Sequence, residues 1–375
     1  MKKYFLVLLA IVLVIVLLLS GCAKSTQSPA TAPAQVPEGG KGSGVRYSAP
    51  PMEYQGEHER SQFLTQEVIL PYVKGLEDKS GWKLKILYYD RDTEVKNTAL
   101  MDGIASNAVQ MGTVVNVLEP GRYPLTEVVS LPFIAPSSTI ASLVAWHLHE
   151  QFPEWQAQFP AEVKVLSHFV SASSQIHTVD KPIKSVADLE GMKVMALNAW
   201  GIKVLEKVGA IPQQVLIADI YGGLEKGMAE GVLCPLTTVR TTNVSEVAKH
   251  HTVINLNYDM FTIPINGGVF EKLPAELQQI IVDESGAKLA EDAGKAMDES
   301  ALIDSNWMIE QGATFHQLPE AEMAKLTEMV MPIQEDWVAE MEAKGLPGRA
   351  ILEEALRYSD ELAAQGKFVP EYPTE

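Results

Sequence analysis

The sequence predicts an α/β fold with two domains, and three observations support this prediction. Segments with strand-like alternation recur between segments of helical periodicity, beginning with residues 82–89 after the helical stretch 62–79. The chain has 375 residues, which is enough to bury two domain-sized cores. At residues 193–197 a strand opens into a loop and a helix, the place where α/β sheets hold their ligands.

The first 22 residues have the pattern of a lipoprotein signal. Two lysines precede the apolar run 4–19, and the tetrapeptide Leu-Ser-Gly-Cys22 matches a site cleaved before a lipidated cysteine. An uncleaved transmembrane anchor is the alternative, but the run is short for a span. We expect residues 1–21 to be removed and Cys22 to carry the lipid. The exported protein would then be anchored at the outer face of the cytoplasmic membrane or in the periplasm.

Residues 22–44 have the composition of a flexible tether, rich in Pro, Gly, Ser and Ala. The formal net charge of the chain is −18, and it lacks the basic patch that phosphate backbones require. This argues against nucleic acid as a partner. Since Cys22 is the expected lipidation site, Cys234 stands alone and no internal disulfide is expected.

The part of the chain after the tether begins as a β-α-β unit. The pair Pro50-Pro51 should stop the first strand, and Pro71 should kink or break the first helix. The acids of residues 90–94 lack the glycine and the terminal glutamate of a calcium loop, so we interpret them as solvated. We expect strands at 45–49, 82–89, 109–117 and 163–170, and helices at 62–79, 98–107 and 140–151.

The second half continues the alternation and ends in helices. Gly209 should stop the helix that follows the strand 193–197, and Asp219 is a suitable N-cap for the next helix. A helical pattern then runs from 275 to 311 without a clear break. We expect further strands around 175–177, 215–217, 232–236, 252–256, 262–269 and 312–316, and helices at 200–208, 219–229, 319–344 and 350–365.

No catalytic constellation is found in the sequence. Nucleophile-elbow, phosphate-loop, H-E-x-x-H and C-x-x-C motifs are missing. His147 and His149 are two positions apart on a helix, so they point to different faces and cannot share a metal. Cys234 would need a positioned base to act as a nucleophile, and we interpret it as a small buried residue. We therefore predict a binding protein rather than an enzyme, with no cofactor.

Two segments carry a resemblance to a known family. Residues 120–128 read P-G-R-Y-P-L-T-E-V and are followed by L-P-F at 131–133. Residues 175–178 read Q-I-H-T and are followed by the turn K-P-I at 181–183. These segments resemble the substrate-binding proteins of TRAP transporters, the DctP-type extracytoplasmic solute receptors, and the resemblance covers about residues 45–345. Arg122, between two prolines, has the alternative role of a donor that fixes its loop.

The resemblance implies a periplasmic-binding-protein-like fold with a ligand cleft between the domains and a long helix spanning both. The first domain would hold residues 45–172 plus 261–300, and the second 173–260 plus 301–375. The cleft would close on a small-molecule ligand, which the protein would deliver to integral-membrane subunits of a TRAP transporter. A receptor that serves an ABC importer or a sensor is the alternative.

The resemblance also implies a set of ligand contacts. The arginine that anchors the ligand in the family falls at Met195, which has the alternative role of a core residue. Trp200 supplies either an aromatic wall or an anchor for its helix. The other ligand-binding positions implied by the resemblance are Ser174, Gln175, Cys234, Ile217 and Asn116, with Val115 as an alternative to Asn116.

The methionine at position 195 determines which ligand we expect. A buried carboxylate without its arginine would lack its main partner, at a cost of several kcal/mol. We therefore expect a neutral or largely apolar ligand. The alternative is an acid held by another cation, such as Arg122, Arg240 or a metal ion.

Overall fold

The computed structural model describes residues 49–57 and 62–374. The expected signal peptide, the lipidated Cys22, the tether and residues 45–48 of the first expected strand lie outside them. In the described part of the chain, every helix is too short or too polar to cross a lipid bilayer.

One six-stranded sheet of the described residues is built from the first part of the chain and one late strand. Its main path is β2-β1-β3-β11-β4, and β5 pairs with β11. The β5 and β11 strands are antiparallel, and their register shifts between Ile263 and Pro264, where proline has no N–H to donate. The strands are β1 (Met52–Gln55), β2 (Ile86–Tyr89), β3 (Met111–Gly112), β4 (Val114–Val115), β5 (Val163–Val170) and β11 (Met260–Asn266).

A second six-stranded sheet of the described residues has the order β12-β10-β6-β9-β7-β8. β7 lies between β8 and β9 and is parallel to both, so its carboxyl end opens toward the helix that follows it. The strands are β6 (Ser174–Thr178), β7 (Lys193–Ala196), β8 (Ile211–Gln214), β9 (Gly231–Pro235), β10 (His250–Val253) and β12 (Thr314–Gln317).

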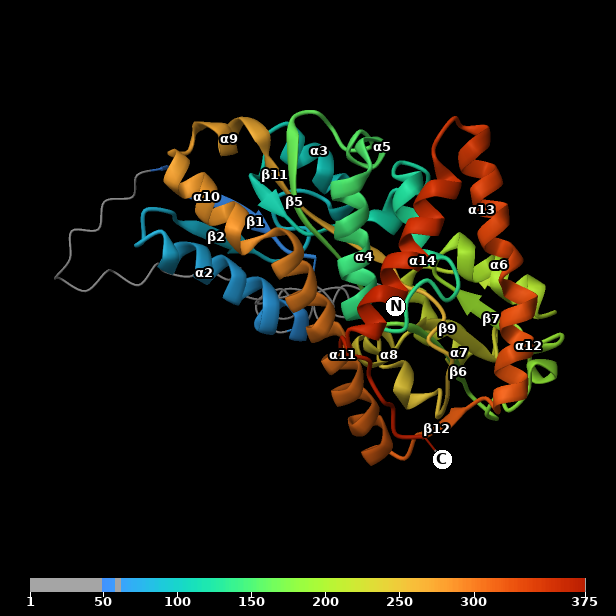
Figure 1. Cartoon of the computed structure of the whole chain (residues 1–375). Coiled ribbons are helices and arrows are strands. Elements are labelled where there is room, and N and C mark those ends of the chain that lie inside the picture. The colour runs from blue at the N-terminus through green and yellow to red at the C-terminus, as the bar shows by residue number, and fades with distance from the viewer. Residues whose placement is uncertain (1–48, 58–61, 375) are drawn as a thin grey trace, which may run out of the picture. The chain divides into compact units, whose positions relative to one another are not determined.

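Helices cover both sheets (Figure 1). Short 3₁₀ segments precede several of them, among them η4 (Pro124–Ser130) and η6 (Ile217–Asp219). The α-helices are α2 (Leu70–Lys79), α3 (Leu100–Ala105), α4 (Ser138–Gln151), α5 (Pro153–Gln156), α6 (Ala199–Lys207), α7 (Ile220–Glu225), α8 (Leu236–Thr241), α9 (Gly267–Lys272), α10 (Ala275–Glu284), α11 (Gly286–Glu310), α12 (Glu320–Val330), α13 (Pro332–Ala343) and α14 (Gly348–Ala364).

The long helix α11 contacts both halves of the fold. It packs against α4 and β5 on the side of the first sheet and against α8 and β12 on the side of the second, as Figure 1 shows. Gly294 allows the close approach to α4, since a Cβ there would lie 2.6 Å from the Ser138 carbonyl oxygen. The buried Asp298 carboxylate accepts hydrogen bonds from the backbone N–H groups of Ser138 and Thr139, both at 2.9 Å. An acid on α11 thereby satisfies the free donors at the start of α4.

Several expected boundaries were wrong. The strand β1 lies after Pro50 and Pro51 and pairs on both sides, whereas the strand expected at 45–49 lies outside the described residues apart from Ala49. The expected strand at 215–217 is replaced by β8, which ends at Gln214. The helical run from 275 is divided into two helices at Ser285. The next residue, Gly286, has a φ of +62°, which interrupts the helical backbone between them.

Prolines affect two other helical runs. Pro71 stands in the first turn of α2, which follows a π-helical turn (Thr65–Ile69) without interruption, so the helix changes type near Pro71 but does not break. The expected helix 319–344 is two helices, and Pro332 opens the second of them. In both places proline occupies a first-turn position, where its missing N–H costs no hydrogen bond.

Candidate ligand-binding site

A cavity of about 920 Å³ lies between residues of the two sheets. The first sheet and α11 contribute Val115, Phe261 and Met297 to its lining, all less than a tenth exposed. Met195 lines it from the carboxyl half of β7, and Pro235 lines it from the end of β9. The cavity therefore lies at strand ends, where the sequence placed it.

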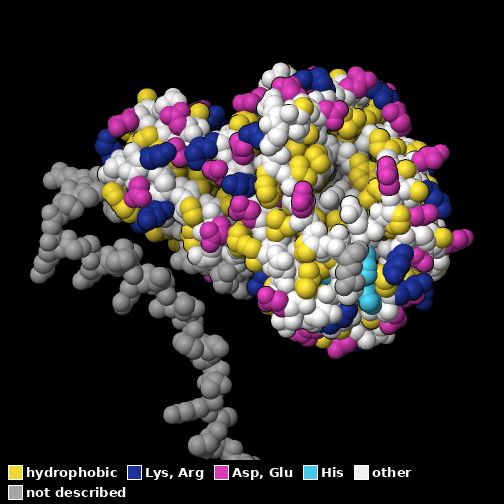
Figure 2. All heavy atoms as spheres, turned by 60° about the horizontal axis from the view of Figure 1, so that its bottom comes forward, with side chains coloured by type: hydrophobic (Ala, Val, Ile, Leu, Met, Phe, Trp, Pro, Cys, Tyr) yellow, Lys and Arg dark blue, Asp and Glu magenta, His cyan; other side chains and the backbone are white. Residues whose placement is uncertain are grey.

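The outer part of the cavity is apolar and open. Leu216, Ile217 and Met228 line the cavity and are 72%, 46% and 59% exposed. They belong to the segment between β8 and β9, which contains η6 and α7. Figure 2, one face of the molecule, shows that hydrophobic side chains also stand between interspersed acidic and basic ones elsewhere on the surface.

Met195 belongs to both the core and the cavity lining. Its side chain is 1% exposed and packs against α7, where a Cβ on Gly223 would lie 2.0 Å from its Cε atom. The missing side chain of Gly223 provides the space that Met195 occupies. Met195 is therefore a core residue and also a residue of the cavity lining.

Trp200 and Asn116 line a second cavity, of about 90 Å³, which shares Leu197 and Gln214 with the first. The Trp200 Nε1 donates to Glu127 Oε2 at 3.0 Å, and this contact joins α6 to η4. The Asn116 Oδ1 accepts from Thr262 Oγ1 at 2.9 Å. Trp200 therefore anchors its helix and also borders a cavity.

Three of the expected contacts lie outside the lining of both cavities. Gln175 is buried, and its Oε1 accepts from the backbone N–H groups of Ile254 and Asn255 at 2.7 and 2.9 Å. Ser174 and Cys234 are buried in the paired strands β6 and β9. Burial raises the pKa of the Cys234 thiol, which keeps it protonated and unreactive.

Asp259 is a cavity residue that motif matching missed. It is 8% exposed and lines the large cavity from the segment just before β11. The Asn198 Nδ2 donates to its Oδ1 at 2.9 Å, and among the described residues no donor contacts its Oδ2. Burial raises the pKa of this carboxyl group, and the Asn198 hydrogen bond opposes the rise.

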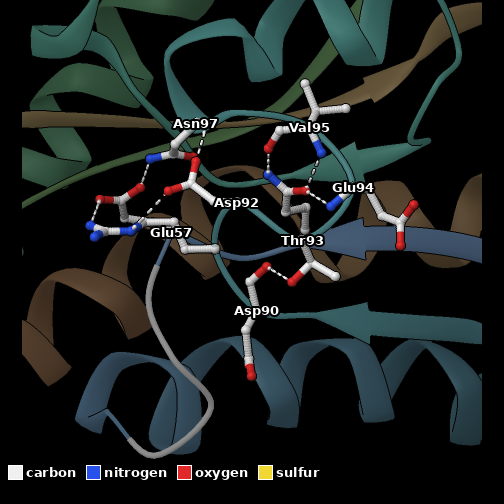
Figure 3. A network of polar contacts seen from close by, with 9 residues as sticks. Glu57, Asp90, Asp92, Thr93, Glu94, Val95 and Asn97 are labelled. Atoms are coloured by element: carbon white, nitrogen blue, oxygen red, sulfur yellow. Dashed lines mark hydrogen bonds and ion pairs between the residues drawn. The ribbon is translucent and has the colours of Figure 1, made fainter. Parts of the chain in front are cut away.

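Glu57 is the second buried acid of the lining. Figure 3 shows its carboxylate directed toward the Asn97 amide, which donates to it, and Arg91 Nη1 lies 3.7 Å from its Oε1. Burial raises the pKa of Glu57 to about 8, while Arg91 lowers it. In the same loop the Asp92 Oδ1 accepts from the backbone N–H of Asn97 at 2.7 Å, so this acid fixes the loop.

The cations proposed as alternative anchors lie elsewhere. Arg122 donates to Glu119 and to Asp102, and Arg240 Nη1 donates to Asp304 at 2.5 Å; neither arginine lines the cavity. Arg122 thus has the loop-fixing role given as its alternative. In the described residues no group of three or more His, Cys, Asp or Glu side chains is placed to hold a metal ion. Lys226, an exposed residue after α7, is the cation of the described lining.

The two α/β halves, the long helix between them and a cavity at the strand ends define a solute-binding protein. The chain belongs to the DctP family, the bacterial extracellular solute-binding proteins of family 7, whose sequence model matches residues 56–341. This confirms the resemblance to TRAP substrate-binding proteins. Proteins of this family are extracytoplasmic receptors that bind small ligands and work with membrane transporter subunits, and they are not enzymes.

Similar proteins place the chain within this family. It is 23% identical over 242 residues to the 2,3-diketo-L-gulonate-binding periplasmic protein of Escherichia coli K12, covering 61% of this chain and 70% of that protein. It is 28% identical over 171 residues to the C4-dicarboxylate-binding periplasmic protein of Rhodobacter capsulatus, covering 43% of this chain and 49% of that protein.

Solved structures confirm the fold. A TRAP solute-binding protein from Rhodoferax ferrireducens with copurified benzoate has a TM-score of 0.77 at 21% identity, covering 85% of this chain and 100% of that one. A TRAP periplasmic protein from Bordetella bronchiseptica with bound mandelate has a TM-score of 0.74 at 22% identity, covering 84% and 99%. The two-domain α/β fold expected from the sequence is therefore correct.

Proposed function

We propose that this protein captures a small organic ligand in the large cavity and delivers it to the membrane subunits of a TRAP transporter. We further propose that the ligand has a largely apolar body and no carboxylate held in the manner of the family. The observation that supports this proposal is that Met195 lines the cavity, and the resemblance implies that the family's anchoring arginine falls at this residue.

The charges of the lining disfavour a carboxylate ligand. A carboxylate enclosed without a cation costs several kcal/mol, which corresponds to roughly a thousandfold or more in affinity. Arg122 and Arg240 are engaged by acids outside the cavity, so neither is available as a substitute. Met195, Val115 and Phe261 offer apolar surface instead.

An aromatic carboxylate is the second candidate. Two similar structures hold benzoate and mandelate, and Lys226 places a positive charge on the lining of this cavity. Lys226 is exposed, however, and an ion pair in contact with water contributes only about 0–1 kcal/mol. The apolar lining therefore favours the first candidate.

We propose that the cavity closes by a hinge motion of two domains. The first would hold residues 45–172 plus 261–300 and the second 173–260 plus 301–375, which follows the division of the strands between the two sheets. α14 packs against α4 and η4 as well as α13, so it would link the domains. Closure would cover the exposed Leu216 and Ile217, and this burial would favour the closed form.

We also propose that residues 1–21 are cleaved and that the lipid on Cys22 holds the receptor at the outer face of the cytoplasmic membrane or in the periplasm. The test is Cys22→Ser, which we expect to leave the membrane fraction or to remain unprocessed. A variant that fractionates and migrates like the wild type would refute the anchor.

The ligand proposal is tested by native mass spectrometry of the purified protein, followed by calorimetric titration with benzyl alcohol, benzoate and succinate. We expect a ligand with a largely apolar body and no carboxylate to be retained, and succinate not to bind. Tight binding of succinate or benzoate would overturn the ligand class, and loss of that binding in Lys226→Gln would assign the second candidate. Turnover of the bound molecule would overturn the receptor function itself.

A further inference from the structure

The lining of the large cavity points to a more specific ligand class. We propose that the ligand is an organic cation, in which an apolar body carries one protonated nitrogen that donates to the carboxylate of Asp259. This inference rests on the proposed receptor function and names the chemistry of its ligand.

The position of the Asp259 carboxylate is fixed by its neighbours. The Asn198 Nδ2 holds its Oδ1 at 2.9 Å, while the Asn198 Oδ1 accepts from the backbone N–H of Gly201 at 2.8 Å and caps α6. The Asp259 N–H donates to Ser171 Oγ at 3.0 Å. Asp259 thus lies just before β11, and its carboxylate is held by the residue that caps α6. Its orientation therefore does not depend on a ligand.

The second oxygen of this carboxylate lacks a partner in the described part of the chain. Asp259 is 92% buried, and it lines the cavity. Asp259 Oδ2 is not among the buried unpaired atoms of the described residues, so it is accessible from the cavity. An accessible carboxylate oxygen can accept from a ligand, and a charged donor forms the stronger hydrogen bond. An ammonium group in the cavity would supply both the donor and the compensating charge. It would also offset the burial that raises the pKa of Asp259.

The other charges of the described lining favour a cation. Glu57 and Asp219 are acids, and Lys226 is the one base. Figure 3 shows that Glu57 is engaged by Asn97, and Arg91 also lies close to it. Because burial raises the pKa of Glu57 to about 8, this residue adds little negative charge to the cavity at neutral pH. An anion would meet the carboxyl groups of Asp219 and Asp259 and one exposed lysine. A cation would be attracted by these acids and repelled only by the lysine.

Phe261 supplies a second feature that suits a cation. It lies two residues after Asp259, and side chains two positions apart on an extended chain point to the same side. Both residues line the cavity. An aromatic ring attracts a cation through its negative face, and the thioethers of Met195 and Met297 add polarisable surface.

The test uses three probes that differ only in the charge of one group: benzylamine, benzyl alcohol and benzoate. Calorimetric titration of the full-length protein at neutral pH should show benzylamine binding at least tenfold more tightly than the other two. Asp259→Asn should weaken benzylamine about ten- to a hundredfold and leave benzyl alcohol within threefold, because a hydrogen bond to a charged group contributes that much. Asp219→Asn, which removes an exposed acid of the same cavity, should change benzylamine binding less than threefold.

A second variant keeps the inference testable if Asp259→Asn does not fold. Lys226→Gln should maintain or increase the affinity for benzylamine, because it removes the opposing charge. Binding of benzoate or benzyl alcohol but not benzylamine would overturn the cation while leaving the receptor function intact. Unchanged benzylamine binding in folded Asp259→Asn would do the same. If none of the three probes binds and no small molecule copurifies, the receptor function fails as well.

Discussion

The contact between Met195 and α7 yields a sharp prediction about stability. Gly222 and Gly223 are neighbours in α7 and both line the cavity. A Cβ on Gly223 would lie 2.0 Å from Met195 Cε and 3.2 Å from its Sδ, whereas a Cβ on Gly222 would meet nothing within 4 Å. The change to alanine is chemically the same at both positions, so Gly222→Ala is a matched control for Gly223→Ala.

The expected magnitudes follow from two opposing effects. Replacing glycine by alanine inside a helix stabilises the folded state by about 0.5–1 kcal/mol, and this applies to both variants. Forcing a methyl group into occupied space costs about 1–3 kcal/mol, and this applies only to Gly223→Ala. We therefore expect Gly222→Ala to be more stable than Gly223→Ala by about 1–3 kcal/mol. Part of the cost will be relieved if the flexible end of Met195 moves into the cavity.

Urea unfolding of the two variants and of Met195→Ala measures these effects. Met195→Ala alone should cost about 2–5 kcal/mol, as for other buried methionines. In combination with Gly223→Ala it removes the clash, so the double-mutant cycle should show a coupling energy of about 1–3 kcal/mol. Equal stability of the two alanine variants, with a coupling energy near zero, would refute the packing of Met195 against Gly223.

Two further predictions concern buried polar groups. Burial lowers the pKa of His177 to about 4, with an unfolded value near 6.5, so between these pH values the unfolded chain binds a proton that the folded chain does not. The free energy of unfolding should therefore fall as the pH drops through this window, and His177 should account for up to about 3 kcal/mol of the loss. In urea unfolding, the stability of His177→Gln should depend less on pH than that of the wild type. Parallel pH profiles of the two proteins would contradict this. Trp200→Phe removes the donor to Glu127 and should cost about 1–3 kcal/mol. In a Glu127→Ala background, which lacks the acceptor, the cost should be smaller, and equal costs would exclude the hydrogen bond as the cause.

The hydrogen bonds of His177 also determine its tautomer. Its Nε2 lies 3.0 Å from the Cys234 carbonyl oxygen, so Nε2 carries the proton and Nδ1 accepts. The His251 Nδ1, at 2.8 Å, is then the donor. The His251 Nε2 is left as a buried acceptor without a partner among the described residues, and burial lowers the pKa of His251. This neutral pair contributes to the acid sensitivity predicted for the fold.

The sequence predicted regular elements where the pattern was strong. Strand β5 has the expected bounds, and α4 differs from the expectation by two residues, because long periodic segments are determined mainly by their own burial pattern. The break at Ser285 was missed, because a glycine with positive φ interrupts the helix without interrupting its hydrophobic periodicity. The strand expected at 215–217 failed because its apolar residues line an open cavity rather than a core.

Met195 and Ile217, two of the contacts implied by the resemblance, line the large cavity, but the resemblance did not indicate the charge of the lining. Asp259 lies between β10 and β11, in a segment without strand or helix periodicity, and its hydrogen-bond partner Asn198 is 61 residues earlier in the chain. Only the folded chain brings these residues together.

Met195, which the resemblance puts at the position of the family's arginine, and Asp259 line one cavity. An arginine at position 195 would attract the Asp259 carboxylate, and a carboxylate ligand would have to compete with this aspartate for the guanidinium. Without the arginine, Asp259 lacks a cationic partner of its own in the described lining, apart from the exposed Lys226. With methionine at the position that the resemblance gives to the anchor, we propose that Asp259 is left as the group that a cationic ligand would satisfy.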